Sequence, residues 1–318
     1  MPSCANKQEI RIYFTDFWAD FDIQNNVYSS ILNNYYIIVV DKENPEFLFH
    51  SCFGNDHFQY FCVKIFCIGE NMTPDFNITD YAYGFDNIEF DDRYLRYPLF
   101  KFFLRDDDFM TKSDNFFLKE IQYKKKFCNF IYSNAGSASP ERENFFHTLS
   151  QYRKVDSGGA LLNNIGHRVD DKLAWQREYK FSIAFENASK NGYTTEKILH
   201  ALQAHTIPIY WGNPRVAEDF NPERFVNCHA YSSMAEVVRA VQTLDENLEQ
   251  YANMLQKPWF TKPVLALPQN DPVFINFFRH IIDQGPENAR RLTRYGYSRR
   301  YYLYQQARLT TLAPKNTS

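Results

Sequence analysis

The chain lacks a long hydrophobic run and a surplus of positive charge. Its longest apolar stretch, residues 35–40, has the length of a strand and is too short to span a bilayer. The first ten residues lack the basic segment and apolar run of a signal peptide. A formal charge of −3 argues against a general nucleic-acid binder, which needs a basic surplus. We therefore expect a cytoplasmic protein without a nucleic-acid partner.

Metal-binding cysteine patterns are also missing. The 6 cysteines stand at positions 4, 52, 62, 67, 128 and 228, with no CxxC pair and no histidine at ligand spacing. A zinc site is therefore not expected, and free thiols in a reducing compartment are the simplest interpretation. The sequence also has no internal repeat.

What the chain does have is length and apolar content. Its 318 residues suffice for two α/β domains, and a hydrophobic content of 44% supports packed cores. Aromatic residues make up 18% of the chain, and most are expected inside. Short apolar runs at 10–14, 35–40 and 61–68 alternate with polar connectors, which predicts alternating strands and helices.

The segment from Phe181 to Gly212 carries the most specific local signal. Residues 181–185 and 207–211 are predicted to be strands, with a helix between them that begins after Thr194. Lys197 falls in the first turn of that helix, where a cation opposes the helix dipole unless an anion lies between them. The inward face of the helix is predicted to hold Ile198, Ala201, Leu202 and His205.

The same arrangement is predicted upstream. A strand over 127–132 is followed by a small-residue loop over 133–138 and by a helix whose N-cap and first residue are Ser139 and Pro140. Arg142 falls in the first turn of this helix. Each cation alone also fits a solvated side chain paired with a neighbouring glutamate. Together, two helix N-termini with cations favour a site for a diphosphate.

Four stretches carry a resemblance to a known family. The longest is FENASKNGYTTEKILHALQAHTIPIYWGNPRVAEDFNPERFVN, and the others are IGENMTPDFNITDYAYGFD, DDRYLRYPL and KKKFCNFIYSNA. They resemble the α-1,3-fucosyltransferases of glycosyltransferase family ten, above all the bacterial, Helicobacter-type members. The resemblance implies an α/β protein of the GT-B fold, with two Rossmann-like domains that face a cleft. We expect an acceptor-side domain over 1–122, a GDP-fucose-binding domain over 123–275 and a helical, basic tail over 276–318.

The implied reaction is an inverting transfer of L-fucose from GDP-β-L-fucose to the GlcNAc of N-acetyllactosamine-type acceptors. The product would be of the Lewis x type, as in the O-antigen of bacterial lipopolysaccharide. The alternatives are an α-1,4 or dual-specificity enzyme, a GT-B transferase for another nucleotide sugar, and a nucleotide-sugar or glycan-binding protein without turnover.

The resemblance also assigns roles to single residues. Glu70, after the strand predicted at 61–68, is implied as the base that takes the proton of the acceptor hydroxyl. The residues implied to bind the donor are Arg142 and Lys197 at the β-phosphate, Asn187 and Tyr193 at phosphate or fucose, and Glu196 at the ribose. Glu186 either orients Lys197 or the fucose, or only ends the strand. GDP-fucose is then a co-substrate and no metal is required, because the acids at 106–108 are predicted to form a solvated turn and not a metal-binding DxD motif.

The tail is basic, with no acidic residue from Asn288 onward. One interpretation is an amphipathic segment that contacts anionic lipid at the inner membrane. The other is a solvated or packed tail. Gly296 and the dispersed tyrosines argue against one continuous helix. Its arginines from Asn288 onward are Arg290, Arg291, Arg294, Arg299, Arg300 and Arg308.

Overall fold

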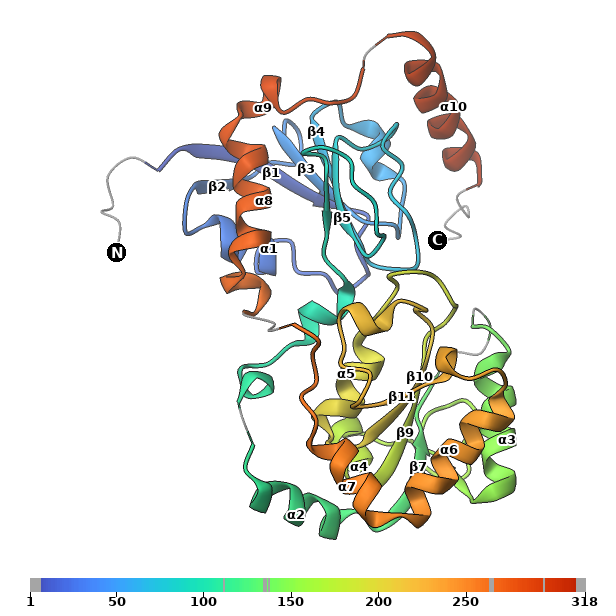
Figure 1. The fold of residues 1–318 in the computed structure, drawn as a ribbon. Coiled ribbons are helices and arrows are strands. Elements are labelled where there is room, and N and C mark those ends of the chain that lie inside the picture. Colours follow the sequence, from blue (N-terminus) through green and yellow to red (C-terminus); the bar gives the residue numbers. More distant parts are fainter. Residues whose placement is uncertain are drawn as a thin grey trace. The chain divides into compact units, whose positions relative to one another are not determined.

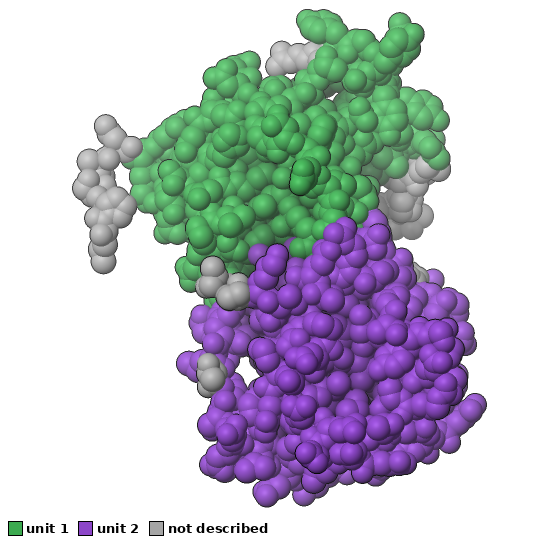
Figure 2. All heavy atoms as spheres, viewed as in Figure 1, with its two compact units in different colours: residues 1–97, 266–318 green, residues 98–265 purple. Residues whose placement is uncertain are grey.

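The computed structural model describes residues 7–110, 112–133, 136, 138–262, 266–293 and 295–312. The chain divides into two compact units, coloured separately in Figure 2. The first unit holds residues 1–97 and 266–318, and the second holds residues 98–265. Each unit is built around one parallel sheet.

The first unit contains a six-stranded sheet in the order β2-β1-β3-β4-β5-β6. All neighbouring strands in it are parallel. Every residue of β3, β4 and β5 is buried, as expected for parallel strands that are covered on both faces. The strands are β1 (Glu9–Thr15), β2 (Ile37–Val40), β3 (Phe47–His50), β4 (Val63–Cys67), β5 (Tyr81–Gly84) and β6 (Tyr94–Arg96).

Helices from both ends of the chain complete the first unit (Figure 1). Among them is α8, where Phe274, Phe278 and Ile281 are buried at helical spacing. The ring of Phe278 lies 5.6 Å from that of Phe49 in β3. The helical segments are α1 (Val27–Leu32), η1 (Asp56–Gln59), η6 (Pro268–Asn270), α8 (Pro272–Asp283), α9 (Gly285–Asn288) and α10 (Gly296–Leu312).

The second unit contains a five-stranded parallel sheet in the order β11-β10-β9-β7-β8. Phe181 and Ile183 of β9 and Ile207 of β10 belong to one buried apolar cluster with Leu149 of α3. The strands are β7 (Lys126–Phe130), β8 (Val155–Ser157), β9 (Tyr179–Phe185), β10 (Ile207–Trp211) and β11 (Val226–Asn227). The helices are α2 (Asp114–Tyr123), α3 (Glu141–Tyr152), α4 (Lys172–Arg177), α5 (Glu196–Gln203), α6 (Met234–Glu246) and α7 (Leu248–Gln256), with short 3₁₀ turns η2 (Leu99–Phe103), η3 (Asp106–Phe109), η4 (Val216–Glu218) and η5 (Cys228–Ala230).

The predicted α/β class with two parallel sheets is confirmed, but the units divide at other residues than expected. Residues 98–122 belong to the second unit, and residues 266–318 return to the first. The return has a clear physical cause, because the buried face of α8 packs against strand β3 and helix α1 of the first unit. The helix in the segment 181–212 also begins one residue later than predicted, with Thr195 as N-cap. Upstream, Pro140 is the N-cap of α3, where Ser139 was expected.

The tail contains the helix α10. Gly296, at φ 72°, is the first residue of α10 and does not interrupt it. Tyr302 is buried, and its ring packs 5.3 Å from that of Phe58. Arg294 and the last six residues of the predicted tail lie outside the described residues. Within the part of the chain that the structure describes, no helix combines the length and apolarity needed to span a membrane.

Candidate functional site

The second unit contains a polar pocket at the carboxyl ends of β7 and β9. Its volume is about 230 Å³. Ile131, Tyr132 and Ser133 directly follow β7, and Asn187 lies two residues after β9. This is the edge of an open parallel sheet where ligands bind. The pocket is lined by Ile131, Tyr132, Ser133, Arg142, Lys172, Gln176, Ile183, Asn187, Glu196 and Lys197.

Arg142 of α3 is fixed in the wall of this pocket. It is 2% exposed, and its Nη2 donates to Asn187 Oδ1 at 2.7 Å and to the carbonyl of Phe185 at 3.2 Å. Its guanidinium lies over the ring of Tyr132, 4.1 Å from the centroid. The hydroxyl of Tyr132 donates to the carbonyl of Ile183 at 2.8 Å, which holds the ring in place. The sequence therefore placed this cation correctly in the first turn, and the structure adds that it is buried.

Lys197 of α5 lies between two carboxylates. Its Nζ is 3.2 Å from Glu186 Oε2, 3.4 Å from Glu196 Oε1 and 2.9 Å from Thr195 Oγ1. Burial alone would lower the pKa of Lys197, but the two carboxylates outweigh it and raise the pKa above its usual value. The amine is therefore charged, and its position is set before any ligand arrives.

Glu186, directly after β9, is the anchor of this arrangement. It is fully buried, and its two oxygens accept the backbone N–H of Thr195 at 2.8 Å and the hydroxyl of Thr195 at 2.6 Å. Gly212 comes so close that a Cβ there would lie 2.4 Å from Glu186 Cγ, and its φ of 154° also favours glycine. Glu186 therefore orients Lys197 from behind the pocket, which agrees with one of its two predicted roles.

Sequence reasoning missed Lys172, the first residue of α4. Its Nζ lies 3.1 Å from Nδ1 of His200, and burial lowers its pKa below the usual value. Burial alone would raise the pKa of Glu196, but the charges of Lys197 and Lys172 outweigh burial and lower the pKa below its usual value, so Glu196 is ionised. Lys172 lies 25 residues before Lys197 in the sequence, and no local pattern marks it. Among the lining residues, three cations thus face one carboxylate, a balance suited to an anion.

The other predicted site residues fall in different places. Asn187 lines the pocket, whereas Tyr193 is buried in the loop before α5 and is not among the described lining residues. Glu70 belongs to the first unit, where it is exposed in the turn that follows β4. The acids at 106–108 form η3, and Asp108 accepts hydrogen bonds from Arg105 N and from Gln203 Nε2, both at 2.8 Å.

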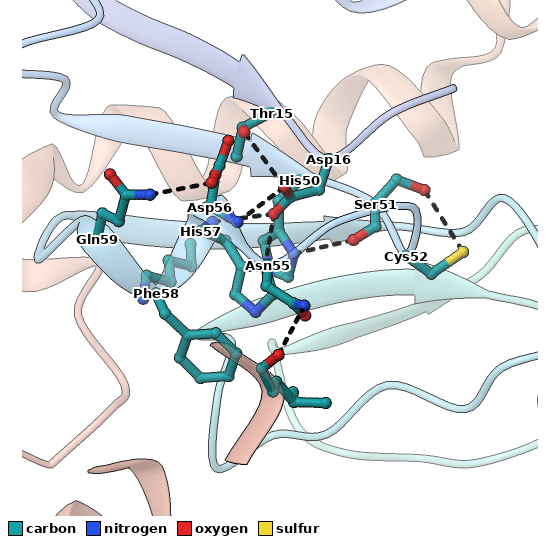
Figure 3. A network of polar contacts seen from close by, with 12 residues as sticks. Thr15, Asp16, His50, Ser51, Cys52, Asn55, Asp56, His57, Phe58 and Gln59 are labelled. Carbon is teal, nitrogen blue, oxygen red and sulfur yellow. Dashed lines mark hydrogen bonds and ion pairs between the residues drawn. The ribbon is translucent and has the colours of Figure 1, made fainter. Parts of the chain in front are cut away.

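A second polar network lies in the first unit, at the carboxyl ends of β1 and β3 (Figure 3). The carboxylate of Asp16 accepts the backbone N–H groups of Asp56 and His57, and Nδ1 of His57 donates to it at 2.6 Å. The ring of His50 stacks on that of His57, with centroids 4.4 Å apart. Asp16, His50 and His57 form the one group of three potential metal ligands within the described ranges. Because Asp16 already binds His57 and the start of η1, we assign the network to holding this turn.

Comparison with known proteins identifies the family. A model for the α-(1,3)-fucosyltransferase FucT N-terminal domain matches residues 12–103, and one for the C-terminal part of glycosyltransferase family 10 (fucosyltransferase) matches residues 121–264. A crystal structure of an α1,3-fucosyltransferase superposes with a TM-score of 0.74 at 30% identity, and the match covers 88% of this chain and 92% of that one. The chain belongs to glycosyltransferase family 10.

Two further relatives support this assignment. The α-(1,3)-fucosyltransferase FucT of Helicobacter pylori is 34% identical, over 77% of this chain and 59% of that protein. The chain therefore spans about three fifths of the length of that relative. A crystal structure of an α1,3-fucosyltransferase with GDP-fucose matches with a TM-score of 0.70 at 30% identity, covering 88% of this chain and 92% of that one. The predicted family and the GT-B type of fold are confirmed.

Proposed function

We propose that this family 10 member transfers L-fucose from GDP-β-L-fucose to O3 of the GlcNAc of N-acetyllactosamine-type acceptors. The observation that carries the proposal is the pocket at the carboxyl ends of β7 and β9, where Arg142 and Lys197 converge from the first turns of α3 and α5. Two cations and two helix N-termini at one place suit a diphosphate better than a single charge. Relatives that carry the name fucosyltransferase support GDP-fucose as the nucleotide sugar.

The residues of the pocket divide the work of donor binding. Arg142 and Lys197 neutralise the charge that develops on the β-phosphate as GDP leaves. Asn187, which already holds Arg142, contacts phosphate or sugar, and Tyr193 contributes from the loop before α5. Glu196 accepts from the ribose hydroxyls, while Glu186 positions Lys197. With these cations present, the leaving group needs no metal ion.

The chemical step is a single displacement. The acceptor O3 attacks C1 of fucose, the bond between C1 and the β-phosphate oxygen breaks with its electron pair going to GDP, and the β-linked donor gives an α-linked product. The carboxylate of Glu70 takes the proton that O3 loses. Its position after β4 of a parallel sheet supports this role, since ligands bind at the carboxyl ends of such strands.

A direct assay tests the proposal. The protein is incubated with GDP-fucose and N-acetyllactosamine, and the position of any new linkage is determined by NMR. We expect an α-linkage to O3 of GlcNAc. A linkage to O4 would establish the α-1,4 alternative. GDP-fucose binding without product, with Glu70→Gln indistinguishable from wild type, would instead identify a binding protein and refute the transferase.

A further inference from the structure

The first unit contains a second basic cavity that the proposed reaction does not use. Its volume is about 330 Å³. It lies near the amino end of β4, whereas Glu70 follows the carboxyl end of the same strand. Lys64, Arg290 and Arg299 line it together with Ser298 and Tyr302, and no acidic residue is found among its described lining residues.

Lys64 is an unusual residue for the interior of a sheet. It is 1% exposed, and its Nζ donates to the hydroxyl of Tyr302 and lies 4.6 Å from the centroid of that ring. Within the described ranges, no carboxylate lies at ion-pair distance from this amine. A buried ammonium without a paired anion is costly, so such a group is rare unless a ligand completes it.

The two arginines add charge that is only partly balanced. Arg290 Nε lies 4.0 Å from Asp80 Oδ1, the limit of an ion pair, and its Nη1 donates to the carbonyl of Phe61. The carboxylate of Asp80 already accepts the backbone N–H groups of residues 64, 291 and 292. The guanidinium of Arg299 lies against the rings of Phe61 and Tyr302, at 5.3 and 5.2 Å. Three cations therefore share one carboxylate that is already satisfied.

The start of α10 points to the same kind of ligand. Ser298 and Arg299 lie in the first turn of this 17-residue helix, which contains no acidic residue. Helix N-termini favour anions, and a cation there opposes the dipole. The placement of Arg299 thus repeats that of Lys197 and Arg142 in the second unit.

The electrostatics of Lys64 agree with this geometry. The pKa of Lys64 is lowered to about 7, above all by burial and also by the neighbouring Arg290 and Arg299, whereas Cys62 and Asp80 act in the opposite direction. A bound anion would offset the repulsion among the three cations. It would also leave the buried amine with a partner.

We propose that this cavity is a binding site for a dianionic phosphate group, either free or as the head of a larger phosphorylated molecule. Lys64, Arg290 and Arg299 supply the charge, and Ser298 with the N-terminal turn of α10 supplies further donors. Two or more charges on the ligand match the three cations better than a carboxylate does. The site is separate from the residues of the proposed transfer reaction, since Glu70 does not line it and the residues of the donor pocket belong to the second unit.

The test is a titration of the full chain with inorganic phosphate, which calorimetry and ³¹P NMR measure. GDP is present at saturation to occupy the proposed donor site. We expect one phosphate per chain. Arg299→Gln should weaken binding at least about tenfold, the effect of losing one charge-assisted contact. The matched control is Arg300→Gln, because Arg300 is exposed on the same helix and does not line the cavity.

The outcomes separate a built site from diffuse attraction. Binding that falls in Arg299→Gln and not in Arg300→Gln supports the site. No phosphate binding by the wild type, or equal losses in both variants, overturns it. Because Arg299 is half-buried at the surface, its variant should fold even where changes at Lys64 do not. Binding to vesicles of phosphatidylcholine with phosphatidic acid then identifies the source of the phosphate group. Vesicle binding that depends on Arg299 and not on Arg300 assigns the site to a lipid headgroup. Binding of inorganic phosphate without binding to vesicles assigns it to a soluble ligand.

Discussion

Replacement of Lys197 by methionine should reduce both GDP binding and stability, for two separable reasons. Lys197→Met removes a charge-assisted contact to the proposed diphosphate, worth about 1.5–3 kcal/mol, so GDP affinity should fall about 10- to 150-fold. The change also leaves Glu186 fully buried and without its cation, 3.2 Å away in the wild type. Breaking a buried pair from one side costs about 3–5 kcal/mol of unfolding free energy.

A double variant distinguishes the two effects. In Lys197→Met with Glu186→Gln, the fully buried position 186 carries no unpaired charge, and the amide oxygen of glutamine still accepts from Thr195. Glu196 also loses Lys197 but is partly exposed and keeps Lys172 as a neighbouring cation. We expect this variant to recover most of the lost unfolding free energy and none of the GDP affinity. Urea denaturation measures the unfolding free energy, and isothermal titration with GDP measures the affinity. Lys154→Met serves as a control, since Lys154 is 70% exposed and pairs only at the surface with Asp156.

Two results would refute this reasoning. Unchanged GDP affinity in folded Lys197→Met would remove the lysine from the donor site. A double variant that regains GDP affinity together with stability would mean that Lys197 acts on binding only through the fold.

Three further predictions concern other residues. Glu70→Gln should lower kcat by about 10²- to 10⁴-fold with GDP affinity unchanged, measured by initial rates and calorimetry, and a retained kcat would exclude Glu70 as the base. Arg142→Lys keeps the charge but loses the fork that reaches Asn187 and the stacking on Tyr132, so GDP affinity should fall about tenfold or more; equal affinity would show that charge alone suffices. Burial alone would raise the pKa of Asp16, but the hydrogen bonds from His57 outweigh burial and hold this pKa below its ordinary value of 3.8. The ionised carboxylate therefore stabilises the fold above pH 3.8. This stabilisation is lost as the pH falls through the lowered pKa. Asp16→Asn should flatten that acid limb in denaturation curves measured against pH, and an unchanged limb would contradict the assignment.

The strands that could be predicted from the sequence are those that form continuous apolar runs. Residues 207–211 form β10 with the predicted bounds, and the runs at 181–185 and 10–14 lie within β9 and β1. Such runs are readable because parallel strands are buried on both faces. The run at 35–40 contains β2, which is shorter than predicted, because Tyr36 packs as part of the preceding turn.

The division of the chain could not be read in the same way. The apolar spacing of Phe274, Phe278 and Ile281 is visible in the sequence, but it does not say which sheet the helix covers. That choice depends on the rings of Tyr28 and Phe49, more than 220 residues away in the sequence. The free cysteines were a safer inference, and all five that the structure describes are unpaired. Cys4 lies outside the described residues.

The candidate site was predictable where chemistry conflicted with local structure. Arg142 and Lys197 stand out because cations in a first turn oppose the helix dipole. Lys172 gives no such signal, since it enters the pocket from α4 through the packing of that helix against α5. The burial of Arg142 and the two hydrogen bonds that Thr195 donates to Glu186 are likewise properties of the folded unit. They involve contacts between residues up to 45 positions apart.

The two hydrogen bonds from Thr195 to Glu186 affect how the pocket would accelerate the proposed reaction. Both oxygens of Glu186 are fixed by Thr195, so this carboxylate cannot follow a ligand into the pocket. Lys197 is therefore held in one place by a rigid partner, and little rotamer entropy remains to be lost when the diphosphate arrives. Its charge is shared with two carboxylates in the resting state, which limits its attraction for the intact donor. As the bond to fucose breaks, the β-phosphate gains negative charge and competes better for the same amine. The interaction then strengthens most in the transition state, which is the condition under which binding energy raises kcat.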